Sequence, residues 1–351
     1  AHSGSLFIIT TPDGANIPGG VTETNFPLLV RLDSGNFNFG EAQSDGRDIR
    51  FTTAGGAALP YQIEEWDAGA GTASIWIKIP TITGNARQEI VMYWGKTGVA
   101  SESDGSAIFN AANGYASVIH MDGAIQDEVG SVTPTNSGTT LSTGRIGRSR
   151  HLSPGQGINC GTNITSFPTG SGSHSSQAWI RPDAANNTVL GWGIEQGQGK
   201  VVMQLANPPH MNMDCYFGGG NVTGGSTLAL GEWIHVVHTY QSNSARIYVN
   251  GVLDGSTGGG TMNIPSPARM YIGGWYGNYN FSGDIDEVRI SKVTRSANWV
   301  KLEYENQKSL QTLVGSLVQS GTTFSASPPS VTINEGTGAT LTGQAGGAQK
   351  V

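Results

Sequence analysis

Three carboxylates cluster at the start of one predicted strand. Residues 283–290 read Gly-Asp-Ile-Asp-Glu-Val-Arg-Ile, and the two-residue period of a strand places Asp286, Val288 and Ile290 on one face. A carboxylate that shares a face with two apolar residues costs free energy unless it is ion-paired or bound to a cation. This strand is therefore a candidate metal site.

The ligand type at this strand favours calcium, because Ca²⁺ takes several carboxylate and carbonyl oxygens at flexible geometry. Two further acids lie on the predicted first strand of the same domain and in its loop. The predicted ligands, with Asp286 foremost, are Asp286, Asp284, Glu287, Asp122 and Asp127. The alternative is an ordinary cross-strand ion pair, for example with Arg289 or Arg181.

An aromatic segment precedes these acids. Trp275, Tyr276 and Tyr279 lie between glycine-rich turns, with Asn278 and Asn280 interleaved. We expect a loop rather than a strand here, with flat aromatic rings that stack on sugar rings and amides that reach their hydroxyl groups. The alternative is that Trp275 or Phe281 fills the edge of a sandwich.

A second candidate surface is the predicted strand 210–217. Its alternation separates Met211, Met213, Cys215 and Phe217 from a polar and aromatic face composed of His210, Asn212, Asp214 and Tyr216. Such a face is expected of a ligand-facing sheet, although a solvated outer face looks similar. The predicted ligand-binding residues are Trp275, Tyr276, Asn278, Tyr279, Trp192, His210, Asn212 and Tyr216.

Catalysis is a weaker interpretation of the same residues. A glycosidase needs two carboxylates across the scissile bond, and a lyase needs a base and an acid such as His with Tyr. We assign no catalytic residue. If the chain is an enzyme, the candidates are Glu195, His210, Asp214, His238 and Tyr216. The sequence contains no Gly-x-Ser-x-Gly elbow, zinc motif or phosphate loop.

Composition limits the class of protein. The 351 residues carry a net charge of −7, with 13% charged residues and 52 glycines. This balance disfavours nucleic acid as a partner, and no apolar run is long enough to insert into a membrane. The Asn-, Ser- and Thr-rich sequence suggests a secreted or cell-surface bacterial protein. Cys160 and Cys215 are either buried thiols or one disulfide.

The first hundred residues predict a β-sandwich. Phe26, Leu28, Val30 and Leu32 alternate along one segment, and turn clusters separate it from later alternating segments. The motifs that follow one another here are 26–32 (Phe-Pro-Leu-Leu-Val-Arg-Leu), 46–51 (Gly-Arg-Asp-Ile-Arg-Phe), 59–67 and 75–80. They resemble a bacterial family catalogued as a domain of unknown function, which implies a fold and no chemistry. Residues 101–114, which are small and polar, are the predicted linker.

Residues 115–309 predict a second sandwich. Its motifs are 178–183 (Ala-Trp-Ile-Arg-Pro-Asp), 232–240, a hairpin at 247–253 with an Asn250-Gly251 turn, and 283–290. In this order they resemble the laminin-G-like, concanavalin-A-like jelly-roll family. The resemblance implies a structural calcium near strand 283–290. A closing helix is predicted over 296–307, with Ser296 as its N-cap.

The last residues, 310–351, resemble the first strands of an immunoglobulin-like module, with alternation resuming at 331–336. The sequence thus predicts an all-β chain of two tandem sandwiches. The favoured function is non-catalytic recognition of an extracellular polysaccharide, as an accessory module of a secreted carbohydrate-active protein, with further domains of a longer chain as partners. The alternatives are a glycoside hydrolase or polysaccharide lyase acting in the jelly-roll groove, and a structural or adhesive cell-surface protein.

Overall fold

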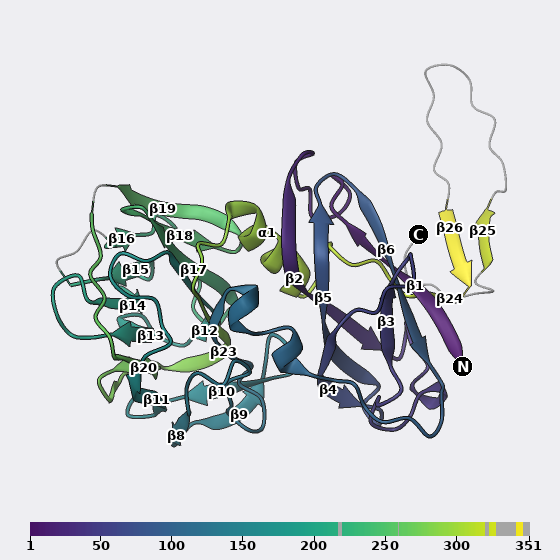
Figure 1. The fold of residues 1–351 in the computed structure, drawn as a ribbon, viewed down its shortest axis with the longest axis horizontal. Helices are drawn as coiled ribbons and strands as arrows, with labels where there is room; N and C mark the ends of the chain where they lie inside the picture. Colours follow the sequence, from purple (N-terminus) through teal and green to yellow (C-terminus); the bar gives the residue numbers. More distant parts are fainter. Residues whose placement is uncertain (217–219, 259, 320–322, 328–341, 347–351) are drawn as a thin grey trace, which may run out of the picture. The chain divides into compact units, whose positions relative to one another are not determined.

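The computed structural model describes residues 1–216, 220–258, 260–319, 323–327 and 342–346 (Figure 1). Strands dominate it, which confirms the predicted all-β class. The chain divides into two compact units, Ala1–Asp104 with Gln311–Val351, and Gly105–Leu310. Among the residues it describes, no helix is long and apolar enough to cross a membrane.

The first unit contains two antiparallel sheets. The three-stranded sheet has the order β2 (Thr22–Asp33), β5 (Thr72–Thr83), β4 (Tyr61–Asp67). The four-stranded sheet has the order β24 (Val318–Gln319), β1 (His2–Ile9), β6 (Arg87–Trp94), β3 (Arg50–Thr53). The alternating residues Phe26, Leu28, Val30 and Leu32 are buried as predicted. A short 3₁₀ helix, η1, spans Phe39–Glu41.

Two domain boundaries differ from the prediction. Residues 105–114 are part of the second unit and form the 3₁₀ helices η2 (Gly105–Ala107) and η3 (Ala111–Asn113), so they are not a linker. After the second unit the chain returns to the first, where β24 pairs with β1. Beyond it, β25 (Thr323–Ser327) pairs with β26 (Thr342–Gly346). The alternation predicted at 331–336 lies outside the described residues.

The second unit is a sandwich of a seven-stranded and an eight-stranded sheet. The seven-stranded sheet has the order β16 (Val222–Thr223), β15 (Met211–Asp214), β14 (Lys200–Leu205), β13 (Asn187–Gly193), β20 (Ala268–Ile272), β11 (Gly157–Ile164), β8 (Thr135–Ser137). Its inner face contributes Leu190, Trp192, Met203 and Met270 to the core.

The eight-stranded sheet has the order β19 (Val252–Gly258), β18 (Ser244–Val249), β17 (Ile234–Gln241), β12 (His174–Pro182), β23 (Gly283–Ser291), β10 (Arg148–Leu152), β9 (Thr140–Thr143), and β7 (Tyr115–Ile119) also pairs with β23. Its inner face supplies Ala178, Val236, Ile247 and Ile285 to the same core. Side chains of both sheets thus bury one continuous apolar layer.

Two local predictions in this unit are confirmed. Asn250 and Gly251 take positive φ angles of 49° and 79° between β18 and β19, as a two-residue hairpin turn requires. Helix α1 (Ala297–Gln307) begins after Ser296, whose side chain accepts a hydrogen bond from the backbone N–H of Trp299. The helix packs on the outer face of the eight-stranded sheet, where Val300 meets Val237 and Tyr248.

Both cysteines are free and buried, which decides between the two alternatives for Cys160 and Cys215. Burial raises the pKa of both thiols because it disfavours the thiolate.

Candidate functional site

Strand β15 separates an apolar face from a polar one, as predicted. Met211, Met213 and Cys215 are buried, Asn212 and Asp214 are half-buried, and Tyr216 is exposed. Phe217 lies outside the described residues. The polar side chains therefore point to the outer face of the seven-stranded sheet, and His210, half-buried, directly precedes the strand.

The aromatic segment is a tight β-hairpin, not the loop that its glycines predicted. Strand β21 (Gly274–Trp275) pairs with β22 (Asn278–Tyr279). The turn residues Tyr276 and Gly277 have φ angles of 53° and 79°, the geometry of a two-residue hairpin. A regular hairpin fixes the direction of its side chains better than a loop does.

Trp275 lies against the outer face of the seven-stranded sheet over Gly191 of β13. A Cβ atom at Gly191 would stand 2.5 Å from the indole ring, so the missing side chain makes room for it. Tyr271 of β20 meets the Trp275 ring edge-on with centroids 5.9 Å apart, and Tyr276 meets it at 4.9 Å. The three rings form one aromatic group, with Tyr276 42% exposed.

A chain of polar contacts joins this hairpin to β15. The Lys200 ammonium of β14 lies 2.9 Å from a carboxylate oxygen of Glu195 and 2.9 Å from one of Asp214. Glu195 accepts a hydrogen bond from the Trp275 indole N–H, and its backbone N–H donates to the Tyr276 hydroxyl over 3.2 Å. The two candidate regions of the sequence are thus physically connected.

We call this set the hairpin cluster; it comprises Glu195, Lys200, Asp214, Tyr216, Trp275 and Tyr276. Lys200 is its buried centre, and its ammonium also lies 5.0 Å from the Tyr216 ring centroid. Burial alone would lower the pKa of Lys200, but the hydrogen bonds to Asp214 and Glu195 outweigh burial and raise it. Lys200 is therefore charged at neutral pH and holds both acids in place.

A row of uncharged polar side chains continues along the same sheet. Thr223 donates to Asn212 over 3.1 Å, and Asn212 donates to Gln204 over 3.4 Å. Asn280 accepts from the backbone N–H of Thr188 over 2.9 Å. A small polar cavity of about 120 Å³ is lined by Asn186, Asn187, Thr188, Gln204, Leu205, Ala206 and Asn280.

Three predicted residues have other positions than expected. Trp192 is fully buried on the inner face of β13, where its indole N–H donates to Ser176 over 2.9 Å, so the prediction that it contacts a ligand is wrong. His238 is fully buried on the inner face of β17, which removes it as a catalytic candidate. Tyr279 packs on Gly157 of β11, whereas Asn278 is exposed on the hairpin.

The prediction that Asp286 shares a face with Val288 and Ile290 is also wrong, because a β-bulge at Glu287 reverses the alternation of β23. Gln177 of β12 is opposite Arg289 and Trp179 is opposite Asp286, so one residue of β12 faces two of β23. Glu287 has a φ angle of 52°. Such a bulge shifts every later side chain to the other face. Val288 and Ile290 enter the core, and the acids lie on the outer face.

Protein groups already hold these acids. Asp284 pairs with Arg181 at 2.8 Å, and Asp286 accepts from the backbone N–H groups of Arg145 and Ile146 over 2.7 and 2.9 Å. The alternative interpretation, an ion pair with Arg181 or Arg289, therefore describes the contacts of Asp284 and Glu287.

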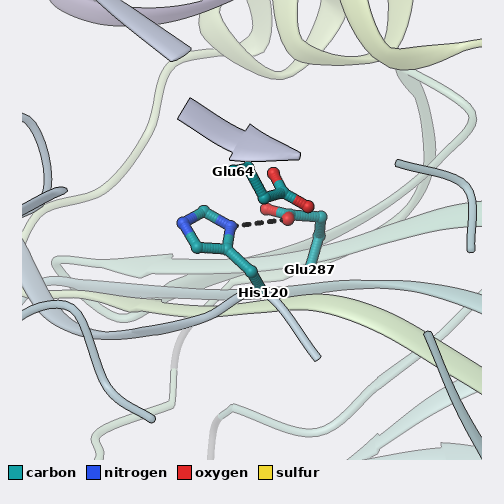
Figure 2. Close-up of side chains that lie close together, drawn as sticks. All are labelled: Glu64, His120 and Glu287. Atoms are coloured by element: carbon teal, nitrogen blue, oxygen red, sulfur yellow. Dashed lines mark hydrogen bonds and ion pairs between the residues drawn. The ribbon is translucent and has the colours of Figure 1, made fainter. Parts of the chain in front are cut away.

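Glu287 lies between two basic groups. Figure 2 shows its carboxylate bonded to His120 Nδ1, at 2.6 Å, and Arg289 contacts its other oxygen at 2.5 Å. Burial would raise the pKa of Glu287, but the charges of His120 and Arg289 outweigh it and lower the pKa. Glu287 is therefore a buried carboxylate with a basic partner on each side.

The two remaining predicted ligands are Asp127 and Asp122. Asp127 accepts hydrogen bonds from backbone N–H groups, among them those of Val118 and Ser131, and burial raises the pKa of Asp122. Of the residues with described coordinates, no three of the five predicted acids bring ligand atoms within 4.8 Å of one another. Calcium stays a prediction.

Two parts of the chain match models of known families. Residues 155–301 match the family model described as the concanavalin A-like lectin/glucanases superfamily. Residues 45–125 match the model of a domain of unknown function, DUF2341. Both resemblances drawn from the sequence are confirmed. The sequence has no significant match among curated proteins.

Several solved structures resemble parts of the chain. Domain 4 of AbnA, a GH43 extracellular arabinanase from Geobacillus stearothermophilus solved with arabinotriose, is 18% identical; the match covers 54% of this chain and 97% of that one, with a TM-score of 0.43. The sialidase of Trypanosoma rangeli is 14% identical over 72% of this chain and 44% of its own, with a TM-score of 0.45. The binding domain of Paraclostridial Mosquitocidal Protein 1 is 14% identical over 55% and 52%, with a TM-score of 0.42.

Proposed function

We propose that the second unit binds an extracellular polysaccharide, without catalysis, through the hairpin cluster. The observation that carries this proposal is the aromatic group of Trp275 and Tyr276, joined by Glu195 and Lys200 to the polar face of β15. Aromatic rings give apolar contact to the C–H faces of sugars, and the surrounding carboxylates and amides bond to their hydroxyl groups. Both chemistries are needed to bind a glycan chain.

The cluster is also fixed before any ligand arrives. Trp275 is held by packing on Gly191 and by its hydrogen bond to Glu195. Glu195 is in turn held by its ion pair with Lys200. A preorganised aromatic side chain loses less conformational entropy on binding, so more of its contact energy remains as affinity. The match of residues 155–301 to a superfamily that includes lectins supports the same proposal. In a longer secreted protein, this unit would serve as an accessory module.

Catalysis fits these residues less well. Glu195 and Asp214 are the paired carboxylates of the cluster, but one ammonium, that of Lys200, contacts both at 2.9 Å. Lys200 thus occupies the space between the two acids, where a scissile glycosidic bond would have to lie. Of the two histidines that a lyase mechanism could use, His210 and His238, His238 is buried in the core.

Affinity electrophoresis of the full chain in gels containing neutral and acidic polysaccharides tests the proposal. We expect retardation by at least one polysaccharide, and a loss of at least about tenfold in affinity for Trp275→Ala, since a central aromatic contact contributes on the order of 2 kcal/mol.

The control is Tyr93→Ala in β6 of the first unit, which removes a 40% exposed aromatic side chain outside the hairpin cluster. Tyr93→Ala should bind as the wild type does. The proposal fails if no polysaccharide retards the wild type, or if Trp275→Ala binds with unchanged affinity and a normal melting temperature. Release of reducing sugar or unsaturated product by the wild type would replace it with the enzymatic alternative.

A further inference from the structure

The outer face of the seven-stranded sheet carries two cations with different partners. Lys200 is held by Glu195 and Asp214. Arg269 of β20, by contrast, has no carboxylate within ion-pair distance among the residues that the structure describes. Lys200 is thus already neutralised by protein acids, and Arg269 is not.

Arg269 lies against the aromatic group. Its guanidinium lies 4.9 Å from the ring centroid of Tyr276, and Tyr276 stacks on Tyr271 with centroids 6.0 Å apart. The Nε–H of Arg269 is buried and meets no acceptor among the residues with described positions. A guanidinium resting on an aromatic ring keeps its terminal N–H groups in one plane, the arrangement that bonds a carboxylate or sulfate in two places.

The strand register places this cation beside the hairpin cluster. Arg269 of β20 is opposite Gly193 of β13, which is opposite Lys200 of β14. Adjacent strands lie roughly 5 Å apart, so Arg269 and Lys200 are separated by about 10 Å across a glycine. A sugar that stacks at the hairpin is therefore within reach of Arg269.

We propose that Arg269 binds an acidic group of the polysaccharide, a carboxylate or a sulfate, while the sugar ring stacks at Trp275. The ligand class is then an anionic polysaccharide rather than a neutral one. The inference rests on the proposed function, because it assigns a ligand class to that same surface.

Matched ligands test this inference. The probes are polygalacturonate, the same polymer with its carboxyl groups reduced to alcohols, chondroitin sulfate, and neutral galactan. We expect the wild type to bind an acidic polymer more tightly than its neutral counterpart, with affinity that falls as NaCl rises. Preference for polygalacturonate over its carboxyl-reduced form indicates a carboxylate, and preference for chondroitin sulfate over the same polymer after desulfation indicates a sulfate.

Arg269→Gln should lower affinity for the acidic polymer about 10- to 100-fold, as expected for the loss of a charged hydrogen-bonding group. Its affinity for neutral polymers should not change. Arg269→Lys should restore affinity only in part, because a lysine ammonium bonds as a point charge. The melting temperature of each variant shows whether it is folded.

The results separate this inference from the proposed function. If the wild type binds neutral or carboxyl-reduced polymer as tightly as the acidic one, or if folded Arg269→Gln keeps its acidic affinity, the inference is overturned while Trp275-dependent binding stands. If Trp275→Ala changes nothing, the proposed function itself fails.

Discussion

The outer faces of the two sheets of the jelly roll carry similar charged residues in opposite surroundings. On the eight-stranded sheet, the side chains of Glu287 and Arg289 are at most 1% exposed. On the seven-stranded sheet, the side chains of Glu195 and Asp214 are 41% and 29% exposed around Lys200. Acids on a strand thus do not by themselves define a site; what covers the strand decides whether they serve stability or recognition.

Helix α1 makes the difference on the eight-stranded face. Gln307 accepts from the Trp179 indole N–H over 2.7 Å, and Glu303 accepts from the Gln177 amide over 3.2 Å. Glu303 also contacts Arg289 at 3.4 Å. The helix therefore covers this face and excludes water from its charges. Removal of one partner of a buried charge pair leaves the other charge unpaired, which is costly.

The largest expected effect is the loss of a buried partner. Arg289→Met would leave Glu287 and Glu303 without their shared cation, so we expect the free energy of unfolding to fall by about 3–5 kcal/mol. Urea denaturation measures it. An unchanged urea midpoint would contradict the view that this face is a buried ionic layer.

The buried histidines predict a loss of stability in acid. Burial, helped by the charges of Arg289 and Arg145, lowers the pKa of His235 to about 3, and burial lowers that of His174 to about 4. The unfolded chain therefore takes up protons near pH 6.5 that the folded chain does not, so stability is full above pH 6.5 and falls as the pH decreases toward these values.

Each such histidine contributes about 2 kcal/mol of destabilisation at pH 5 relative to pH 7.5. His235→Phe should remove about that amount from the difference between the urea midpoints at the two pH values. The ring would still stack between Trp179 and Tyr304, which lie 5.0 and 6.5 Å from the imidazole. A pH dependence equal to that of the wild type would show that His235 is not neutral in the folded chain.

The contrasting variant on the open face is Lys200→Met. Its partners are partly exposed and can be hydrated, so we expect a loss of only about 1 kcal/mol, less than for Arg289→Met. Binding should weaken as well, because Glu195 loses the contact that fixes it beside Trp275. A loss of stability equal to that of Arg289→Met would erase the distinction between the two faces.

A smaller change tests how the Trp275 indole packs on Gly191. Gly191→Ala places a methyl group where the Trp275 ring lies, so the ring must shift. We expect affinity for polysaccharide to fall several-fold while the melting temperature changes little, since the hindrance is a side chain on the surface. Affinity electrophoresis and a thermal melt, run on the same sample, distinguish these outcomes.

The sequence predicted the fold more fully than the site. Two sandwiches, the Asn250-Gly251 turn and the Ser296 cap follow from local patterns and appear as expected. The face on which Asp286 lies was predicted wrongly, because a bulge at Glu287 adds one residue to the strand without any change in the hydrophobic pattern. Domain boundaries also failed where the chain returns to an earlier sheet, since pairing of β24 with β1 is a long-range contact.

The prediction of site residues failed for a related reason. Trp192 and Trp275 look alike in sequence, each beside glycines, yet one enters the core and the other lies on the outer face over Gly191. Side-chain direction in β13 depends on strand pairing, which the sequence does not state. Arg269 and Lys200 were missed altogether; their alternation with apolar neighbours in β20 and β14 was the signal that could have placed them on the outer face.

Hydrogen–deuterium exchange of the full chain, with and without the polysaccharide that retards it most, tests the central claim most directly. We predict slower exchange on binding in residues 191–200, 211–216 and 269–279, with no change in residues 285–307. Protection confined to 285–307, or to the first unit, would contradict the assignment of recognition to the seven-stranded face.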